Sequence, residues 1–366
     1  MVSAQTALPS EERQSSVTVM IVTYNGRKYL KACLDSVLDQ DFPLDQYDVM
    51  VIDNASRDGS ADFVEQNYPT VKVVRMKQNY GPNGALTMVG DLLRTKYVAY
   101  LNQDVVVHRR WLIELWEVIK SHPNAGVVES SMILPGWPEF KELRREGLLG
   151  RAYVWDTTLF GTHEFRTIPV TPTTPPIPVL AVCGAGTLSN LEILAKLDHI
   201  LDPDFFAHGE DLDLGLRLNT AGYEVLLAPR SVVYHDTEWL FHWNVHGIQK
   251  GLWMTQNTIL AFYKSCYWSE FLFLLPRLLL GKLIKAGQNQ SNTVGKLFHG
   301  LLAMPLMLLG LVMALLRLPQ FRNKRRGTLA QRKMPRGWIV QRLLNPSWKP
   351  DPAAWTSLLN RTGERP

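Results

Sequence analysis

The stretch "YVAYLNQDVVV", residues 97–107, has the pattern of a buried strand with polar residues in the middle. Its apolar run reaches Leu101, is interrupted by Asn102-Gln103-Asp104, and resumes with three valines. A carboxylate within an apolar strand is costly unless something pairs with it. Three explanations for Asp104 are open at this point: a salt bridge, a structural turn, or a metal ion that carries a phosphate.

Two earlier segments have the same design. "VTVMIVTYN" (17–25) and "YDVMVIDNASRDGS" (47–60) are apolar runs that end in polar residues. Helical spacing of apolar residues follows them, which predicts an α/β fold with a mainly parallel sheet flanked by helices. Ligands bind at the carboxyl ends of such strands, so we expect Asn25, Asp53 and Asp104 to converge on one site.

The remaining pattern predicts further elements along the chain. We expect a helix capped by Ser60, a strand at 71–76, a helix at 85–95, an extended proline-rich loop within 135–180, and a helix at 210–219.

Composition narrows the class of protein. The 366 residues are enough for a catalytic domain plus a further segment. The three cysteines are far apart and fit neither a zinc site nor a disulfide framework, so we expect a reducing compartment. Residues 1–15 contain no apolar core and are expected to be disordered rather than a secretory signal. Neither a GxGxxG nor a P-loop motif is present.

The C-terminal region combines apolar and basic segments. Two apolar runs, 271–284 and 300–316, precede a region with 12 Lys and Arg but only 2 Asp and Glu from residue 317 onward. A basic cluster beside an apolar segment favours contact with anionic lipid, with nucleic acid or a solvated tail as alternatives. No nucleic-acid motif accompanies the charge, so we expect membrane lipids and no nucleic acid as partners. Both a helical hairpin within the bilayer and a pair lying in one leaflet fit these lengths.

Several polar residues have side chains suited to specific chemistry. Asp53 can accept a hydrogen bond from the imide N–H of a pyrimidine, and Asp104 can bind Mg²⁺ or Mn²⁺. The acids of "HGEDLD" (208–213) stand at a helix N-terminus, where they either cap the helix or supply a general base. His235 is either a further metal ligand or only a polar strand end.

The ordered motifs closely resemble those of family-2 glycosyltransferases. They are "VTYNGRKYLKACLDSVLDQ", "VMVIDNASRDGS", "NYGPNGA", "YLNQDVVV" and "EDLDLGLRLNTAGYEV". The resemblance covers roughly residues 16–262 and is greatest to the bacterial rhamnosyltransferase-type branch. It implies a GT-A fold, Mg²⁺ or Mn²⁺ as cofactor, and inverting transfer of a sugar, rhamnose being our suggestion, from a dTDP- or UDP-sugar.

The resemblance also implies roles for individual residues. They are Thr23, Asn25 and Asp53 for the nucleoside, Asn79 and Gly84 for the donor loop, Gln103 and Asp104 for the DxD position, and Asp211 for the catalytic base. Beside these, we expect Asp104 with His235 to hold the metal, and Glu210 and Gly184 to lie on the acceptor side or its loop. Two positions depart from the pattern: Asn102 replaces the first acid, which makes His235 more necessary, and Pro82 follows the donor-loop glycine.

The predicted organisation has four parts: a disordered N-terminus (1–15), a GT-A domain (16–262), a membrane-associated helical segment (263–320) and a basic tail (321–366). This arrangement suits a lipid-linked or polysaccharide acceptor in cell-envelope glycan synthesis, at the cytoplasmic face of the bacterial inner membrane. The alternatives are a sugar nucleotidyltransferase and a catalytically inactive membrane-attached scaffold.

Overall fold

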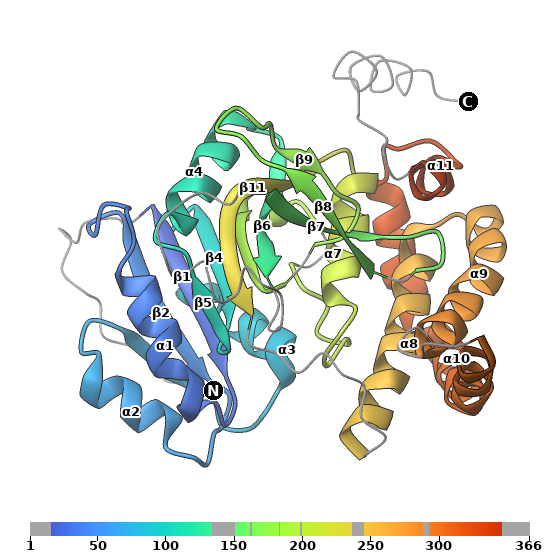
Figure 1. The fold of residues 1–366 in the computed structure, drawn as a ribbon, viewed down its shortest axis with the longest axis horizontal. Helices are drawn as coiled ribbons and strands as arrows, with labels where there is room; N and C mark the ends of the chain where they lie inside the picture. The colour runs from blue at the N-terminus through green and yellow to red at the C-terminus, as the bar shows by residue number, and fades with distance from the viewer. Residues whose placement is uncertain are drawn as a thin grey trace.

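The structure is a computed structural model. It describes residues 16–133, 151–161, 163–182, 184–197, 200–235, 245–287 and 293–345. The predicted disorder of residues 1–15 lies outside these ranges. A central sheet with covering helices forms one side of the molecule, and a layer of C-terminal helices forms the other (Figure 1).

The N-terminal part of the sheet is parallel, as predicted. Its strands follow the order β3-β2-β1-β4, and they are β1 (Val17–Thr23), β2 (Tyr47–Asp53), β3 (Lys72–Arg75) and β4 (Tyr97–Asn102). In the register, Thr23 lies opposite Asp53, and Val22 lies opposite Asn102. The polar ends of three strands therefore meet at one edge of the sheet, where ligands bind in folds of this type.

The helices that follow these strands have their apolar positions buried. They are α1 (Arg27–Leu38), α2 (Ser60–Asn67), α3 (Gly81–Met88) and α4 (Trp111–Ser121). In α1, Leu30, Cys33, Leu34 and Val37 form the buried stripe that their spacing predicts.

The sheet as a whole is mixed rather than mainly parallel. Its second half contains β6 (Ala125–Ile133), β9 (Ile177–Pro178), β10 (Gly186–Asn190) and β11 (Glu224–His235). Strand β10 is antiparallel to both β4 and β6, whereas β11 is parallel to β6 and antiparallel to β9. The prediction of a mainly parallel sheet is correct for the first four strands and for the β6–β11 pair, but β10 enters the sheet from the opposite end.

The stretch 97–107 forms two strands, not one. The turn at Gln103-Asp104 separates β4 from β5 (Val105–Val107), which pairs antiparallel with β11. Val105 lies opposite His235 in that pairing. The interruption in the apolar run therefore redirects the chain and sets Asp104 beside His235.

Other local predictions are corrected. The helix predicted at 85–95 begins at Gly81 and ends at Met88, before a single tighter turn at Gly90–Leu92. Ser60 is the first residue of α2 rather than its cap, and Asp58 Oδ1 accepts a hydrogen bond from the Ser60 backbone N–H at 3.1 Å. The region predicted to be an extended loop contains a hairpin of β7 (Arg151–Thr157) and β8 (His163–Pro169).

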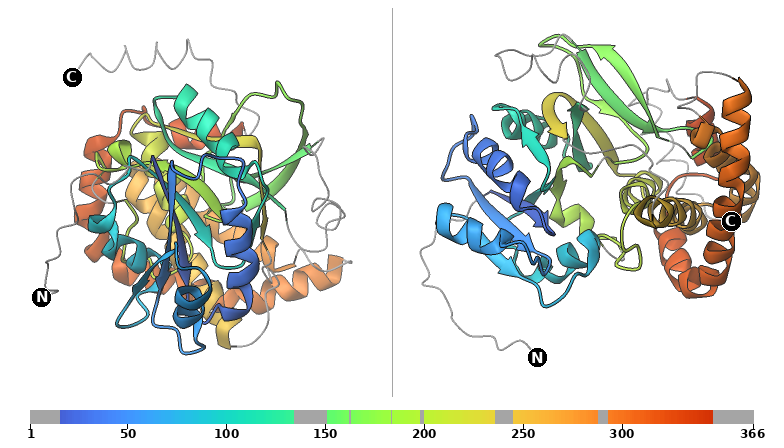
Figure 2. Two further views of the ribbon diagram at one scale, coloured as in Figure 1. Left: turned by 90° about the vertical axis from the view of Figure 1, so that its left-hand side faces the viewer. Right: turned by 60° about the horizontal axis from the view of Figure 1, so that its bottom comes forward.

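The helix predicted at 210–219 is present as α7 (Glu210–Thr220), after a short helix α6 (Leu191–Leu194). Four further helices pack beyond α7: α8 (Val245–Ser265), α9 (Trp268–Gly287), α10 (Thr293–Gln331) and α11 (Trp338–Leu344). Figure 2 shows them as a layer on the side away from α1 and α2. One apolar core joins Leu212 and Leu216 of α7 to Phe262, Leu274 and Phe321 of this layer. The predicted domain boundary at residue 262 therefore does not separate two cores.

The beginning of the predicted basic tail is folded. Residues up to Gln331 continue α10, and the guanidinium of Arg325 donates to the backbone oxygen of Tyr263. Arg332 makes two 2.7 Å hydrogen bonds to the carboxylate of Glu270. These charges fasten helices together; residues 346–366 lie outside the described ranges.

Among the described helices, one is long and apolar enough to cross a membrane by length and composition. It covers Leu301–Gln331 in α10, and its most apolar window has a mean hydropathy of 2.3.

Candidate active site

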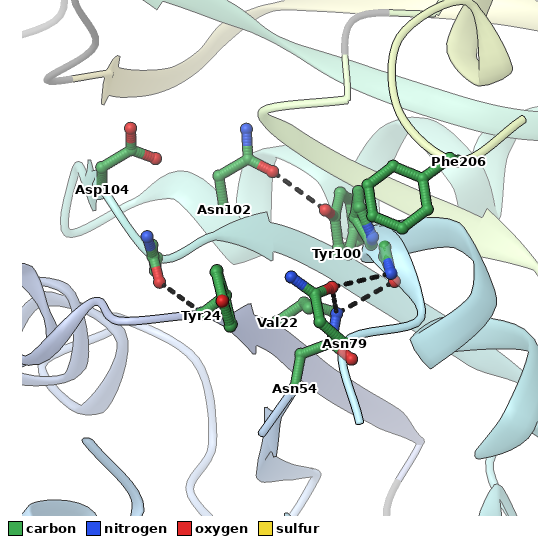
Figure 3. A pocket seen from close by; sticks show the side chains of 11 residues that line it. Val22, Tyr24, Asn54, Asn79, Tyr100, Asn102, Asp104 and Phe206 are labelled. Atoms are coloured by element: carbon green, nitrogen blue, oxygen red, sulfur yellow. Dashed lines mark hydrogen bonds between the residues drawn. The ribbon is translucent and has the colours of Figure 1, made fainter. Parts of the chain in front are cut away.

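A cavity of about 230 Å³ opens at the polar strand ends. It is lined by Val22, Tyr24, Asn54, Asn79, Gly81, Pro82, Tyr100, Asn102, Gln103, Asp104 and Phe206. Figure 3 shows Asp104 and Phe206 at opposite ends of the cavity, with Asn102 and Tyr100 between them.

Asp53 has an unused acceptor next to this cavity. Its side chain is 4% exposed, and its Oδ2 accepts a 3.3 Å hydrogen bond from the Ser56 backbone N–H. Its Oδ1 is buried and has no hydrogen-bond partner among the described residues. A buried carboxylate oxygen without a donor is unfavourable, so the site is suited to a ligand N–H.

Thr23, Gln103 and Asn25 shape the site through contacts with each other and with neighbouring loops. Thr23 Oγ1 donates to Gln103 Oε1 at 2.7 Å, and the Tyr24 backbone N–H donates to the same oxygen at 2.9 Å. Asn25 Oδ1 accepts from the Arg57 backbone N–H at 2.9 Å. Thr23 and Gln103 thus join β1 to the turn after β4, and Asn25 holds the loop after β2.

Asn54 organises the predicted donor loop. Its Nδ2 donates to Asn79 Oδ1 at 2.9 Å and to the Gly81 backbone oxygen at 3.1 Å, while its Oδ1 accepts from Tyr80 N–H at 3.0 Å (Figure 3). Gly81 has a φ of +73°, and a Cβ there would lie 2.2 Å from the backbone oxygen of Phe206. Only glycine suits that close, left-handed position.

The loop then continues into α3, where Gly84 packs against Tyr80. A Cβ at Gly84 would lie 2.9 Å from the Tyr80 side chain. Gly84 therefore permits the tight first turn of the helix and does not line the cavity.

Asp104 and His235 come together as predicted. Asp104 Oδ1 lies 3.2 Å from His235 Nε2. A carboxylate oxygen and an imidazole nitrogen at that spacing fit one divalent cation, and Mn²⁺ accepts both kinds of ligand. In the part of the chain that the structure describes, no group of three or more His, Cys, Asp or Glu side chains is placed to hold an ion. The remaining ligands must then come from elsewhere, such as a bound diphosphate.

Asn102 supports this pair without supplying a free oxygen. Its Oδ1 accepts a 2.9 Å hydrogen bond from the Tyr100 hydroxyl, and its Nδ2 lies 3.4 Å from His235 Nε2. The amide at the first acid position thus has its oxygen engaged by Tyr100, and the greater need for His235 as a metal ligand stays a prediction.

The acids at the start of α7 differ in environment. Burial raises the pKa of Glu210, and the neighbouring charge of Asp211 raises it further. Burial also raises the pKa of Asp211, against hydrogen bonds from backbone N–H groups that include Leu212 at 2.7 Å. Because the pKa of Glu210 is raised to about 8 and that of Asp211 to about 6, Asp211 is the one of the two that is ionised at neutral pH and so is free to accept a proton.

Asp213 belongs to a different environment on the same helix. Although burial raises its pKa, the charges of Lys264 and Arg217, each 2.8 Å away, bring it below its usual value. Its charge is committed to ion pairs, which excludes it as the base.

Tyr100 connects the two acidic regions and was not identified from the sequence. Burial raises its pKa, and so do the negative charges of Glu210, Asp104 and Asp211. Its hydroxyl therefore lies within electrostatic range of both Asp104 and the acids at the start of α7. The period-two alternation of a strand places Tyr100 on the same face as Asn102, which is the signal that could have identified it.

Two other site features depend on long-range packing. Phe206 lines the cavity but comes from the loop before α7. Gly184, predicted on the acceptor side, lies next to Tyr100: a Cβ at this position would be 3.9 Å from the Tyr100 ring. Of the predicted residues, Asn79, Gln103 and Asp104 line the cavity, and the others are not among its lining residues.

The fold and this site define a class of protein. Solved structures share the α/β fold of GT-A type with a mixed sheet. One, "Crystal structure of GalNAc-T7 with UDP, GalNAc and Mn2+", has a TM-score of 0.54 at 17% identity and covers 72% of this chain and 50% of that one. Another, the mannosyltransferase PcManGT from Pyrobaculum calidifontis in complex with GDP-Man and Mn²⁺, has a TM-score of 0.52 at 18% identity, with 92% and 88% covered. At these identities the likeness shows the fold alone.

Sequence comparisons add the family. Residues 18–163 match the family model described as Glycosyl transferase family 2. Glycosyltransferase AglE from Haloferax volcanii is 28% identical over 26% of this chain and 33% of its own length. The putative teichuronic acid biosynthesis glycosyltransferase TuaG from Bacillus subtilis is 31% identical over 24% and 35%, respectively.

A third relative is the poly(ribitol-phosphate) beta-N-acetylglucosaminyltransferase TarS from Staphylococcus aureus, 29% identical over 29% of this chain and 19% of its length. The matches thus span about a third or less of these relatives. Together with the family model they support a family-2 glycosyltransferase domain of GT-A type in this chain. The rhamnosyltransferase branch is not among the relatives described.

Replacing Asp53→Ala should weaken binding of a pyrimidine nucleoside diphosphate by about 1.5–3 kcal/mol, the range for a hydrogen bond to a charged group. Calorimetry with UDP or dTDP measures this. Asp48→Ala, an exposed position on the same strand, is the matched control and should leave affinity unchanged. Equal affinity in wild type and Asp53→Ala would remove Asp53 from the nucleotide site.

Proposed function

We propose that this chain transfers a hexose from a nucleoside-diphosphate sugar to an acceptor in cell-envelope glycan synthesis. The observation that carries the proposal is the arrangement around one cavity. The unused Asp53 Oδ1 suits the base of the nucleotide, and the Asp104–His235 pair suits its diphosphate. The family match and the relatives' printed activities support the same reading.

The residues have distinct roles in this proposal. Asp53 accepts from the imide, and the Asn54-held loop at Asn79–Gly81 closes over the donor. Asp104 and His235 would hold a Mg²⁺ or Mn²⁺ ion, which supplies positive charge near the leaving diphosphate when bound. Asp211 takes the proton of the acceptor hydroxyl as that hydroxyl attacks the anomeric carbon from the opposite face, which gives inversion.

The alternative of a sugar nucleotidyltransferase is less well supported. Such an enzyme needs an open, glycine-rich phosphate loop after the first strand. Here the space beside Gly26 is filled, because a Cβ there would lie 2.0 Å from Gln103 Oε1. The inactive-scaffold alternative is disfavoured by the presence of Asp104, His235 and Asp211 in suitable positions.

Measuring release of the nucleoside diphosphate from the donor tests the proposed activity. The purified chain should be incubated with dTDP-rhamnose, UDP-sugars and GDP-mannose, each with Mn²⁺, Mg²⁺ or EDTA. We expect release from a pyrimidine-nucleotide sugar, with rhamnose as our predicted donor sugar, and loss of release in EDTA that Mn²⁺ restores. Full turnover in chelator would exclude the metal-dependent mechanism.

The variant Asp211→Asn should retain donor binding and melting temperature but reduce transfer by about 10²–10⁴-fold, the range for loss of a positioned base. Because burial raises the pKa of Asp211, wild-type transfer should also fall on the acid side at a higher pH than an ordinary aspartate would give. Asp213→Asn is not a suitable control, since it breaks buried ion pairs. The exposed Asp45→Asn is preferable. Near-normal transfer by Asp211→Asn would place the base elsewhere.

We also propose that α9 and α10 lie against an anionic membrane, at the cytoplasmic face of the inner membrane. Their outer faces expose large apolar side chains: Leu272, Phe273, Leu280, Ile284, Leu301, Leu302, Leu308, Leu309, Val312, Leu315 and Leu316. The exposed Arg322 and Arg326 continue the outer face of α10, which matches anionic head groups. The opposite side of α10 packs on α8 and α9, which favours a helix lying in one leaflet.

Changing Arg322 and Arg326 together to Gln should weaken binding to anionic liposomes by about 1 kcal/mol per residue, and salt should weaken it similarly. Lys324 and Arg325 are unsuitable for this test because they bond to Asp202 and Tyr263 within the protein. The control is Lys31→Gln on α1. Flotation that is equal on neutral and anionic vesicles would contradict the electrostatic part of the proposal.

A further inference from the structure

The loop before α7 is fastened to α8 beside the proposed base. Asn257 Nδ2 donates to the backbone oxygens of Ala207 at 3.0 Å and His208 at 2.7 Å. Gly209 has a φ of +88°, and a Cβ there would lie 2.8 Å from Asn257 Cβ. The backbone that leads into Glu210 and Asp211 is therefore set directly against this helix.

Two lysines from different helices approach the same loop. Lys250 lies two helical turns before Asn257 and so on the same face of α8. Lys282 of α9 donates to Thr258 Oγ1 at 3.1 Å, next to Asn257. Burial lowers the pKa of His208 to about 4, and the positive charges of Lys250 and Lys282 contribute. Burial also lowers the pKa of Lys250. The His208 imidazole is therefore neutral at neutral pH and lies within electrostatic range of the two lysines.

These groups are connected to the donor cavity by aromatic rings. Phe206 lines the cavity, and its ring lies 5.2 Å from that of Trp253 at an angle of 46°. Trp253 is one turn after Lys250 on α8. The aromatic pair therefore lies between the cavity, which Phe206 lines, and the part of α8 that carries Lys250. An acceptor whose hydroxyl reaches Asp211 can place a sugar ring near the aromatic pair and an anionic group near the lysines.

We propose that His208, Lys250 and Lys282 form a binding site for a phosphate or diphosphate group of the acceptor. The inference rests on the proposed transferase function and specifies its acceptor as a phosphate-bearing glycan. Two sources share this chemistry: a lipid-linked diphosphate, whose chain would extend along the apolar outer face of α9, and a water-soluble polyol-phosphate chain.

Calorimetry on the full chain tests the site. Saturating UDP and Mn²⁺ should occupy the donor site first, so that an added probe cannot bind there. Geranyl diphosphate represents the lipid-linked source, and glycerol 3-phosphate represents the polyol-phosphate source. We expect at least one of them to bind, and Lys250→Gln and Lys282→Gln each to weaken its affinity by about tenfold or more, the effect of losing a hydrogen bond to a charged group.

Matched variants make the test specific. Lys250→Arg should retain binding, and Lys96→Gln, which removes an exposed ion pair with Glu192 far from the site, should not change it. Preference between the two probes identifies the source. If UDP binds normally but neither probe binds, or if the Gln variants match Lys96→Gln, the phosphate site is refuted while the transferase proposal stands. If no nucleotide binds with Mn²⁺, the transferase proposal itself fails.

Discussion

A buried ionic cluster beneath α7 holds the two layers of this molecule together. Lys264 of α8 lies 2.7 Å from Asp202 and 2.8 Å from Asp213, and all three side chains are fully buried. Arg217 and Lys324 complete the cluster from α7 and α10. Unpaired charges at this depth would each cost several kcal/mol, and removing one partner of a buried pair typically costs about 3–5 kcal/mol. The cluster is therefore stable only when the C-terminal helices are docked, which makes them part of the same folded unit as the sheet.

The first half of the fold could be predicted from the sequence because its patterns are local. The strands at β1, β2 and β4 are apolar runs with polar ends, and the helix α1 has a regular apolar stripe. The second half could not, because pairing there joins segments distant in sequence. Nothing local indicates that β10 runs antiparallel between β4 and β6, or that β5 leaves β4 to pair with β11. The hairpin β7–β8 was hidden by the prolines that follow it.

The residues of the candidate site also fall into those with local sequence signals and those that depend on long-range contacts. Asp53, Asp104 and Asp211 have local signals, since each acid ends a strand or begins a helix, and the resemblance supplied their roles. Asn54 and Phe206 contact partners 20 or more residues away, and no sequence motif reports those contacts. Tyr100 bonds to Asn102 two residues along the strand, but the charges of Glu210 and Asp211 that act on it come from a distant helix. The structure also separates neighbours that look equivalent in "HGEDLD". The charges of Lys264 and Arg217 lower the pKa of Asp213, whereas burial raises the pKa of Asp211, two residues earlier.

Helix α8 links these features through its spacing. Lys250, Asn257 and Lys264 are seven residues apart, which places them on one face at successive pairs of turns. Lys264 binds Asp213 inside α7, Asn257 holds the loop before α7, and Lys250 acts on His208 in that loop. Helix α8 thus positions the proposed base through its contacts with α7 and with the loop before α7. Helix α10 also packs on α8. Helices α9 and α10, which carry the proposed membrane face, consequently pack on the same helix that holds the loop before Asp211. The proposed membrane contact and the position of the proposed base thus both depend on α8.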